Sequence, residues 1–180
     1  MTPTEERKSR LFYLRRRLRY FYLRLVSLRG SPGELALGMA LGIFVGMMPI
    51  MPFQIAFAVA LALLFSASKI TAAVGTWISN PVTWYAVYFY DYKLGSFLLG
   101  ISPDRALFSS VMRALESGEA PTAVMSKILS AGGTGLAAFL IGGLVSGVVV
   151  SIPSYFIWLG IFKYIRKKRL NRRRVRNDRV

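Results

Sequence analysis

The polar side chains that could bind a ligand gather around one Asn-Pro pair. Asn80 precedes Pro81 in the motif GTWISNP, inside a stretch that is otherwise mostly apolar. Asn is a favoured N-cap and Pro suits the first helical position, so the pair predicts a helix that begins at Pro81. A helix N-terminus in apolar surroundings offers amide groups and partial positive charge to an anion. The motif therefore predicts either a phosphate or carboxylate site at Asn80 or a cap that satisfies only its own turn.

Other neutral polar side chains lie close to this pair in the sequence or could be brought to it by the fold. Hydroxyl groups come from three Thr and Ser residues on either side of the pair. An amide is added by Gln54 if the segment PIMP, residues 49–52, lies opposite. The predicted substrate-binding residues are Asn80, Thr76, Ser79, Thr83 and Gln54.

Ionisable side chains are scarce in the apolar part of the chain. Asp91 and Lys93 stand among several tyrosines, and an ionisable group inside a membrane is often functional. The two lie about 15 Å along a helix from Asn80, which would place them near a membrane interface. We therefore favour an interfacial anchor over a proton relay for Asp91, and a helix cap over a proton carrier for Glu34.

Composition excludes several classes of chemistry. The 180 residues include no Cys and no His. The chain therefore lacks disulfides, thiolate nucleophiles, the commonest metal ligand and the usual proton carrier at neutral pH. We predict no catalytic residue, no metal site and no cofactor, and we do not expect an enzyme.

The apolar residues are concentrated in three blocks. Of all residues 54% are hydrophobic and 18% are charged, and the blocks cover residues 34–67, 70–100 and 133–162. Each block exceeds the roughly 20 residues that cross a bilayer. The sequence predicts an all-α fold: a polytopic helical membrane protein with proline-broken or re-entrant helices and a basic amphipathic N-terminal helix.

Proline interrupts the first two blocks. The motif SPGE, residues 31–34, combines a Ser N-cap, a Pro at the first helical position and a Glu that closes a capping box, so a helix begins there. An unbroken helix over the first block would be about 50 Å long against a core of about 30 Å. Pro49 and Pro52 fall at its centre, and Pro81 breaks the second block. The first block is either a hairpin or a broken, tilted helix, and paired breaks of this kind occur in transporters as well as in ordinary helical hairpins.

The positive charges lie at the two ends. Of 24 Lys and Arg residues, nine lie in residues 1–31 and ten in residues 163–180. We divide the chain into a basic amphipathic helix (1–30), a membrane domain (31–162) and a basic cytoplasmic tail (163–180). The amphipathic helix is expected in the headgroup region, or packed on the protein's own soluble face. Both ends belong in the cytoplasm by the positive-inside rule, so the number of crossings is even.

The polar loop, residues 101–132, carries three cations and three anions and lacks the cytoplasmic signature. The best arrangement places this loop outside, returns the last block to the cytoplasm and makes one of the first two blocks a hairpin. The competing arrangement turns the last block back at Pro153 and keeps the loop inside. Within the loop, residues 106–115 are expected to form a short amphipathic helix.

Gly143 and Gly147 have the GxxxG spacing that lets helices approach closely. We favour packing within the chain, and a homodimer through these two glycines is the alternative. The expected partners are membrane lipids, with anionic headgroups at the basic ends. Nucleic acid is not expected, because topology and lipid binding already account for both basic ends.

Two segments resemble a known family. SPGELALGMALGIFVGMMPIMPFQ (31–54) and GTWISNPVTWYAVYFYDYKLGSFLLG (75–100) resemble the bacterial family of domain of unknown function 2062, DUF2062. The shared features include Gly46, Pro49 and Gln54, and the resemblance covers about residues 31–160. It implies an inner-membrane domain without an established activity, sometimes attached to glycosyltransferases that act on polyprenyl-phosphate carriers. Polyprenyl-phosphate and a glycosyltransferase are therefore expected partners.

Two hypotheses about function follow. The first is a small inner-membrane transporter or translocase for an anionic or polyprenyl-phosphate-linked substrate, with the two proline breaks meeting near the midplane. The alternative is a non-transporting membrane anchor or scaffold that recruits partners through its basic ends. A single polar site shared by both breaks would favour the first, and two separate turns would favour the second.

Overall fold

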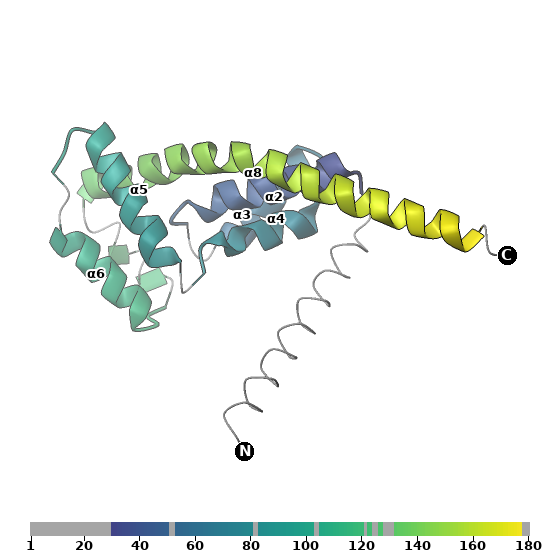
Figure 1. The fold of residues 1–180 in the computed structure, drawn as a ribbon. Coiled ribbons are helices and arrows are strands. Elements are labelled where there is room, and N and C mark those ends of the chain that lie inside the picture. The colour runs from purple at the N-terminus through teal and green to yellow at the C-terminus, as the bar shows by residue number, and fades with distance from the viewer. Residues whose placement is uncertain are drawn as a thin grey trace, which may run out of the picture. The chain divides into compact units, whose positions relative to one another are not determined.

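The computed structural model describes residues 30–177 with short gaps at 51–52, 81–82, 103–104, 121, 124–125 and 128–131. Every regular element in these residues is helical (Figure 1), which confirms the all-α prediction. The predicted amphipathic helix over residues 1–30 lies outside them apart from Gly30. In chain order the elements are α2 (Pro32–Gly46), α3 (Gln54–Leu64), α4 (Lys69–Gly75), the 3-10 helix η1 (Thr76–Ile78), α5 (Trp84–Leu98), α6 (Arg105–Glu116) and α8 (Gly132–Asn177).

The chain divides into two compact units. The described part of the first unit consists of Gly30, Ser31 and the residues from Lys163 onward, and the second, larger unit spans Pro32–Phe162. In the first unit α8 continues as a helix to Asn177, so the basic tail is helical up to that residue. The candidate site lies in the second unit.

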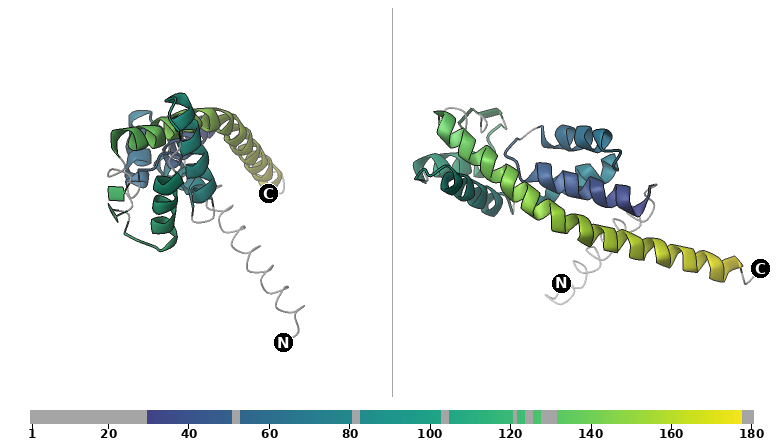
Figure 2. Two further views of the ribbon diagram at one scale, coloured as in Figure 1. Left: turned by 90° about the vertical axis from the view of Figure 1, so that its left-hand side faces the viewer. Right: turned by 90° about the horizontal axis from the view of Figure 1, so that it is seen from above.

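The first block folds as a helical hairpin. α2 begins at Pro32, as the SPGE motif predicts, and ends at Gly46, just before the PIMP segment. α3 then begins at Gln54 and packs back against α2 (Figure 2). The alternative of a broken helix that continues in one direction is therefore wrong for this block.

Glycines bring α2 and α4 into backbone contact. Gly38, Gly42 and Gly46 recur every four residues on one face of α2. A Cβ on any of them would collide with the segment from Ser68 to Ile78. The contacted residue numbers rise together on both sides of this contact. α4 and η1 therefore run parallel to α2.

The second block is broken as predicted, but the second helix starts later. α4 and η1 end at Ile78, and α5 begins at Trp84 instead of Pro81. α5 packs antiparallel on α8, because a Cβ on Gly95 would meet Ala138 and a Cβ on Gly142 would meet the backbone of Asp91.

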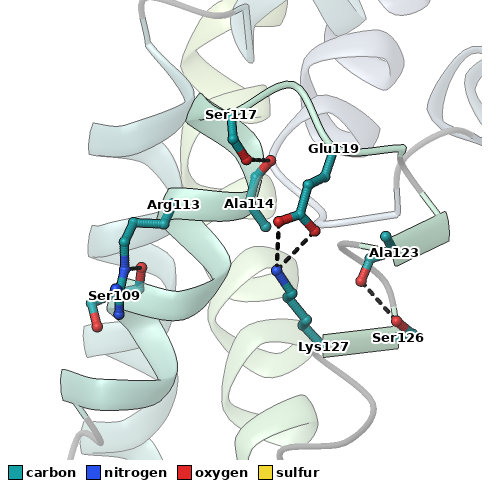
Figure 3. A network of polar contacts seen from close by, with 8 residues as sticks. All are labelled: Ser109, Arg113, Ala114, Ser117, Glu119, Ala123, Ser126 and Lys127. Carbon is teal, nitrogen blue, oxygen red and sulfur yellow. Dashed lines mark hydrogen bonds and ion pairs between the residues drawn. The ribbon is translucent and has the colours of Figure 1, made fainter.

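Aromatic rings join α5, α6 and α8. The Phe108 ring of α6 stacks on Tyr92 with 6.1 Å between centroids, and Tyr92 stacks on Phe139 of α8 at 4.6 Å. The predicted helix over residues 106–115 is confirmed as α6. Residues 117–120, which follow α6, are exposed, and Glu119 forms an ion pair of 2.8 Å with Lys127 (Figure 3).

α8 passes through Pro153 as one helix. The competing arrangement, in which the last block turns back at Pro153, is therefore wrong. α8 also runs antiparallel to α2, because Gly143 faces Met47 and Gly147 faces Phe44. Both GxxxG glycines are thus covered by the chain itself, as favoured from the sequence. A homodimer through them stays a prediction that would require this contact to open.

Large apolar side chains point outward over much of the second unit. Examples from four elements are Phe57 (56% exposed), Trp77 (69%), Phe97 (80%) and Phe156 (64%). The buried positions of α2, α3 and α4 are instead largely small: Ala36, Ala58, Ala62 and Ala72 are fully buried. Soluble monomers rarely expose apolar surface so extensively. Among the described residues, one segment of α8, Gly133–Asn171, is long and apolar enough to cross a membrane, and α2 and α3 are shorter apolar helices.

Candidate functional site at the helix breaks

Gln54 joins the two proline breaks. Its side chain is 8% exposed at the start of α3. Its Nε2 atom lies 3.1 Å from each of three acceptors: the carbonyl oxygens of Gly46 and Met48, and the Ser79 hydroxyl. The last carbonyls of a helix have no partner within it, so this amide stabilises the end of α2. The same amide ties the PIMP break to the GTWISNP break.

Ser79 is the partner on the second break. It is buried, and its hydroxyl can donate to the Thr76 carbonyl at 3.3 Å or to Gln54 Oε1 at 3.5 Å. Gln54 and Ser79 are 25 residues apart in the chain. The structure therefore brings these two predicted binding residues together.

The other three predicted binding residues bond within their own turn. Asn80 Oδ1 accepts the backbone N–H of Thr83 at 3.2 Å, and its Nδ2 donates to the Trp77 carbonyl at 3.3 Å. The Thr83 hydroxyl donates to the Ile78 carbonyl. The Thr76 hydroxyl donates to the Ala73 carbonyl at 2.8 Å. These bonds are those of a cap, the simpler of the two interpretations of the motif.

The surroundings of Asp91 differ more from the prediction than those of any other predicted residue that the structure describes. The Asp91 side chain is 0% exposed, whereas Lys93 is exposed. Ser146 of α8 donates a hydrogen bond to Asp91 Oδ1, and Oδ2 has no hydrogen-bond partner. An interfacial anchor would reach water, so that interpretation is wrong for Asp91. The expected position came from a distance along one helix. The α8 backbone, which covers this face of α5, comes from a distant part of the sequence.

Gln54, Ser79, Asp91 and Ser146 form a polar cluster, to which Tyr88 adds a fifth side chain. Tyr88 was not predicted as a site residue from the sequence. Its hydroxyl is buried without a hydrogen-bond partner and lies among Gln54, Ser79 and Asp91. Tyr88 and Asp91 are three residues apart and share one face of α5. That spacing was visible in the sequence, as was the placement of Ser146 beside Gly147. The buried hydroxyl of Ser96 is also unpaired.

The remaining predicted residues have structural positions. Glu34 is exposed in the first turn of α2, where a carboxylate stabilises the positive end of the helix. Its backbone carbonyl accepts the Ser68 N–H at 3.1 Å, which ties α4 to the start of α2. Pro49 is buried at the first break, and Pro52 and Pro81 lie outside the described residues.

An apolar groove lies along α2 and α8, and Phe44 is its lining residue nearest in sequence to the PIMP break. Its volume is ≈ 480 Å³ and it is lined by α2, α8 and the end of α3, including Leu41, Phe44, Phe65 and Tyr155. Phe44 also packs on Gly147, the residue after Ser146, so the groove and the polar cluster are neighbours. Within the described residues no group of three or more Asp and Glu could hold a metal ion.

Together these features define a class: a small helical protein in which two broken helical segments meet around buried polar side chains. The chain belongs to a bacterial family, because residues 15–171 match the family described as "Uncharacterized protein conserved in bacteria (DUF2062)". This confirms the resemblance and extends it beyond residues 31–160. Comparisons with curated proteins and with solved structures found no match.

Proposed function

We propose that the chain is a multi-pass protein of the bacterial inner membrane with a re-entrant hairpin. α2 and α3 have 15 and 11 residues. They are therefore about 22 Å and 16 Å long, too short to cross a core of about 30 Å. They enter and return as a pair. The apolar side chains on the outside of α3, α5 and α8 support contact with lipid.

The second block then makes a single broken crossing. α4 and η1 run parallel to α2 as far as the break, and α5 continues in the same direction, because α2 and α5 are both antiparallel to α8. α8 returns across the membrane. Two complete crossings place both basic ends on the cytoplasmic side and the loop after α6 outside.

We propose that this protein is a small transporter or translocase, and one observation carries the proposal. The two proline breaks meet at the 3.1 Å contact between Gln54 and Ser79 instead of forming separate turns. Backbone breaks inside a membrane are stable only where protein or a water-lined cavity covers them, and in transporters they form the substrate site.

The groove supports an amphiphilic lipid as substrate. Its apolar lining from α2, α3 and α8 suits a hydrocarbon chain. A headgroup that extends past Phe44, toward the end of α2, would approach the hydroxyl and amide groups of Ser79 and Gln54 at the breaks. The family resemblance adds polyprenyl-phosphate as the candidate. Asn80, Thr76 and Thr83 would contribute to headgroup binding only if their turn opens, because their hydrogen bonds described above are internal.

A flip assay in vesicles tests this function. Purified protein is reconstituted with a fluorescent short-chain polyprenyl phosphate in both leaflets, and a membrane-impermeant reductant is added outside. In protein-free vesicles the reductant bleaches only the outer leaflet, whereas an active protein also exposes the inner pool. We expect Ser79→Ala to slow this second phase, and Ser109→Ala, an exposed serine of α6, to leave it unchanged. Wild-type vesicles that bleach no further than protein-free ones would reject the proposal.

The anchor or scaffold remains the alternative, and one feature favours it. α8 extends as a helix into the basic segment as far as Asn177, which makes a cationic arm suited to acidic partners such as anionic lipid. Deletion of both basic ends, residues 1–29 and 163–180, separates the two functions. A scaffold loses its partner with this deletion and is insensitive to Ser79→Ala, whereas a translocase shows the opposite pattern.

A further inference from the structure

Asp91 is buried in the polar cluster, and in its ionised form it would repel an anionic substrate, so it calls for a different role. We propose that Asp91 is a proton-binding site at the contact between α5 and α8, and that release of its proton accompanies separation of the two helices. The inference rests on the membrane location proposed above, but not on the identity of the transported substrate.

The burial of Asp91 favours the protonated acid in the closed structure. Its side chain is 0% exposed, Oδ1 accepts a hydrogen bond from Ser146, and Oδ2 has no partner. An ionised carboxylate with one unpaired oxygen is unfavourable in such surroundings. A proton on Oδ2 removes the charge without any change in packing.

The groups that face Asp91 supply no compensating charge. On α5 the polar neighbour is Tyr88, one turn earlier, and on α8 it is Ser146. Gln54 and Ser79 approach from the breaks through Tyr88 and are neutral. Lys93 is exposed and two residues away, which places it on the opposite side of α5. Within the described residues the carboxyl group therefore has hydroxyl and amide neighbours only.

These neighbours suit a proton better than a metal ion. A hard cation such as Mg²⁺ or Ca²⁺ needs about six oxygen ligands, whereas the described residues here offer one carboxyl group and a few hydroxyls. A proton needs one carboxyl oxygen. The buried hydroxyl of Tyr88, one turn before Asp91 on α5, is a polar neighbour of both the carboxyl group and the Gln54–Ser79 contact.

Loss of the proton would act on the helix contact itself. A Cβ on Gly142 would collide with the Asp91 carbonyl, and a Cβ on Gly95 would collide with Ala138. The two backbones therefore touch at Asp91 itself and again one turn further along α5, so the buried carboxyl group belongs to a close-packed helix contact. Since an ionised carboxylate needs water or a counter-charge, deprotonation favours an arrangement in which α5 and α8 are further apart.

Infrared difference spectroscopy on protein in lipid vesicles tests the proton site without any substrate. We expect a C=O stretching band of a protonated carboxylic acid that decreases as the pH is raised. The band should disappear in Asp91→Asn and persist in Glu119→Gln, an exposed carboxylate paired with Lys127. In Ser146→Ala the band should shift, because the hydrogen bond to Oδ1 is lost. If Asp91→Asn does not fold, the shift in Ser146→Ala carries the test.

A distance measurement tests the helix separation. The chain has no native Cys, so spin labels can be attached at Phe97→Cys on α5 and Leu140→Cys on α8, both exposed positions. We expect the distance between the labels to increase at high pH in wild type and to stay constant in Asp91→Asn. A band unaffected by Asp91→Asn, or a distance independent of pH, would overturn the inference. A proton band without lipid movement would instead reject only the proposed translocase.

Discussion

The packing of α2 on α4 predicts opposite effects for two identical substitutions. In Gly42→Ala the new Cβ would meet the Ala72 carbonyl and the Gly75 Cα, which are backbone atoms that cannot rotate away. In Gly160→Ala, on the exposed side of α8, a Cβ meets nothing within 4 Å. Both glycines lie inside helices, so any difference between the variants reports the helix contact.

The expected magnitudes follow from two terms. Replacing an interior helical Gly by Ala stabilises a helix by about 0.8–1 kcal/mol. Overpacking of a close contact costs about 1–3 kcal/mol, and rigid backbone on both sides favours the upper part of that range. Gly42→Ala should therefore lower the free energy of unfolding by about 1–2 kcal/mol. Gly160→Ala should raise it by about 0.5–1 kcal/mol.

Equilibrium unfolding in mixed micelles measures both values. Protein in a mild detergent is titrated with sodium dodecyl sulfate, and helix content and tryptophan fluorescence are followed together. A Gly42→Ala variant as stable as Gly160→Ala would contradict the predicted contact. It would mean that α2 and α4 do not touch through this glycine face.

Three further predictions use other contacts. Gln54→Leu leaves the Gly46 carbonyl without its buried donor, at about 1–3 kcal/mol, whereas the Met48 carbonyl keeps the Ile50 N–H; the substitution should lower stability in the same titration, and Ile55→Leu at an exposed neighbouring position should not. Asn80→Asp keeps the acceptor for the Thr83 N–H but loses the donor to the Trp77 carbonyl, so it should be destabilised less than Asn80→Ala, which should lose about 0.5–2 kcal/mol; equal stability of the two would argue against the cap. Ser117→Cys, exposed after α6, should react with an impermeant maleimide in intact cells, and labelling only after permeabilisation would reverse the proposed topology.

Much of the local structure was predictable because it depends on short-range rules. The SPGE motif predicted the start of α2, since a Ser cap followed by Pro leaves no amide unsatisfied. The PIMP and GTWISNP breaks were also predictable, because proline cannot continue a helix's hydrogen-bond pattern. The later start of α5, at Trp84, goes with side-chain capping by Asn80, whose Oδ1 accepts the Thr83 N–H just before the helix.

The candidate site was predictable only in part. Gln54 and Ser79 were named as binding residues on the condition that the two breaks meet, and they do meet. Tyr88 and Ser146 were missed, because a buried hydroxyl has no distinctive sequence pattern until its partner helix is known. Gly38, Gly42 and Gly46 were a visible repeat, yet their contact with α4 depends on the direction in which α3 returns.

The sequence by itself determined where helices start and break, which stretches are apolar and which chemistry is absent, because each of these is a property of neighbouring residues. Tertiary structure alone decided that the first block is a hairpin, that the breaks share one polar cluster and that Asp91 is buried under α8. These outcomes depend on backbone contacts between residues as distant as Asp91 and Gly142. Small residues permit such contacts but do not specify which helix packs against them. The packing of the whole unit determines the partner helix.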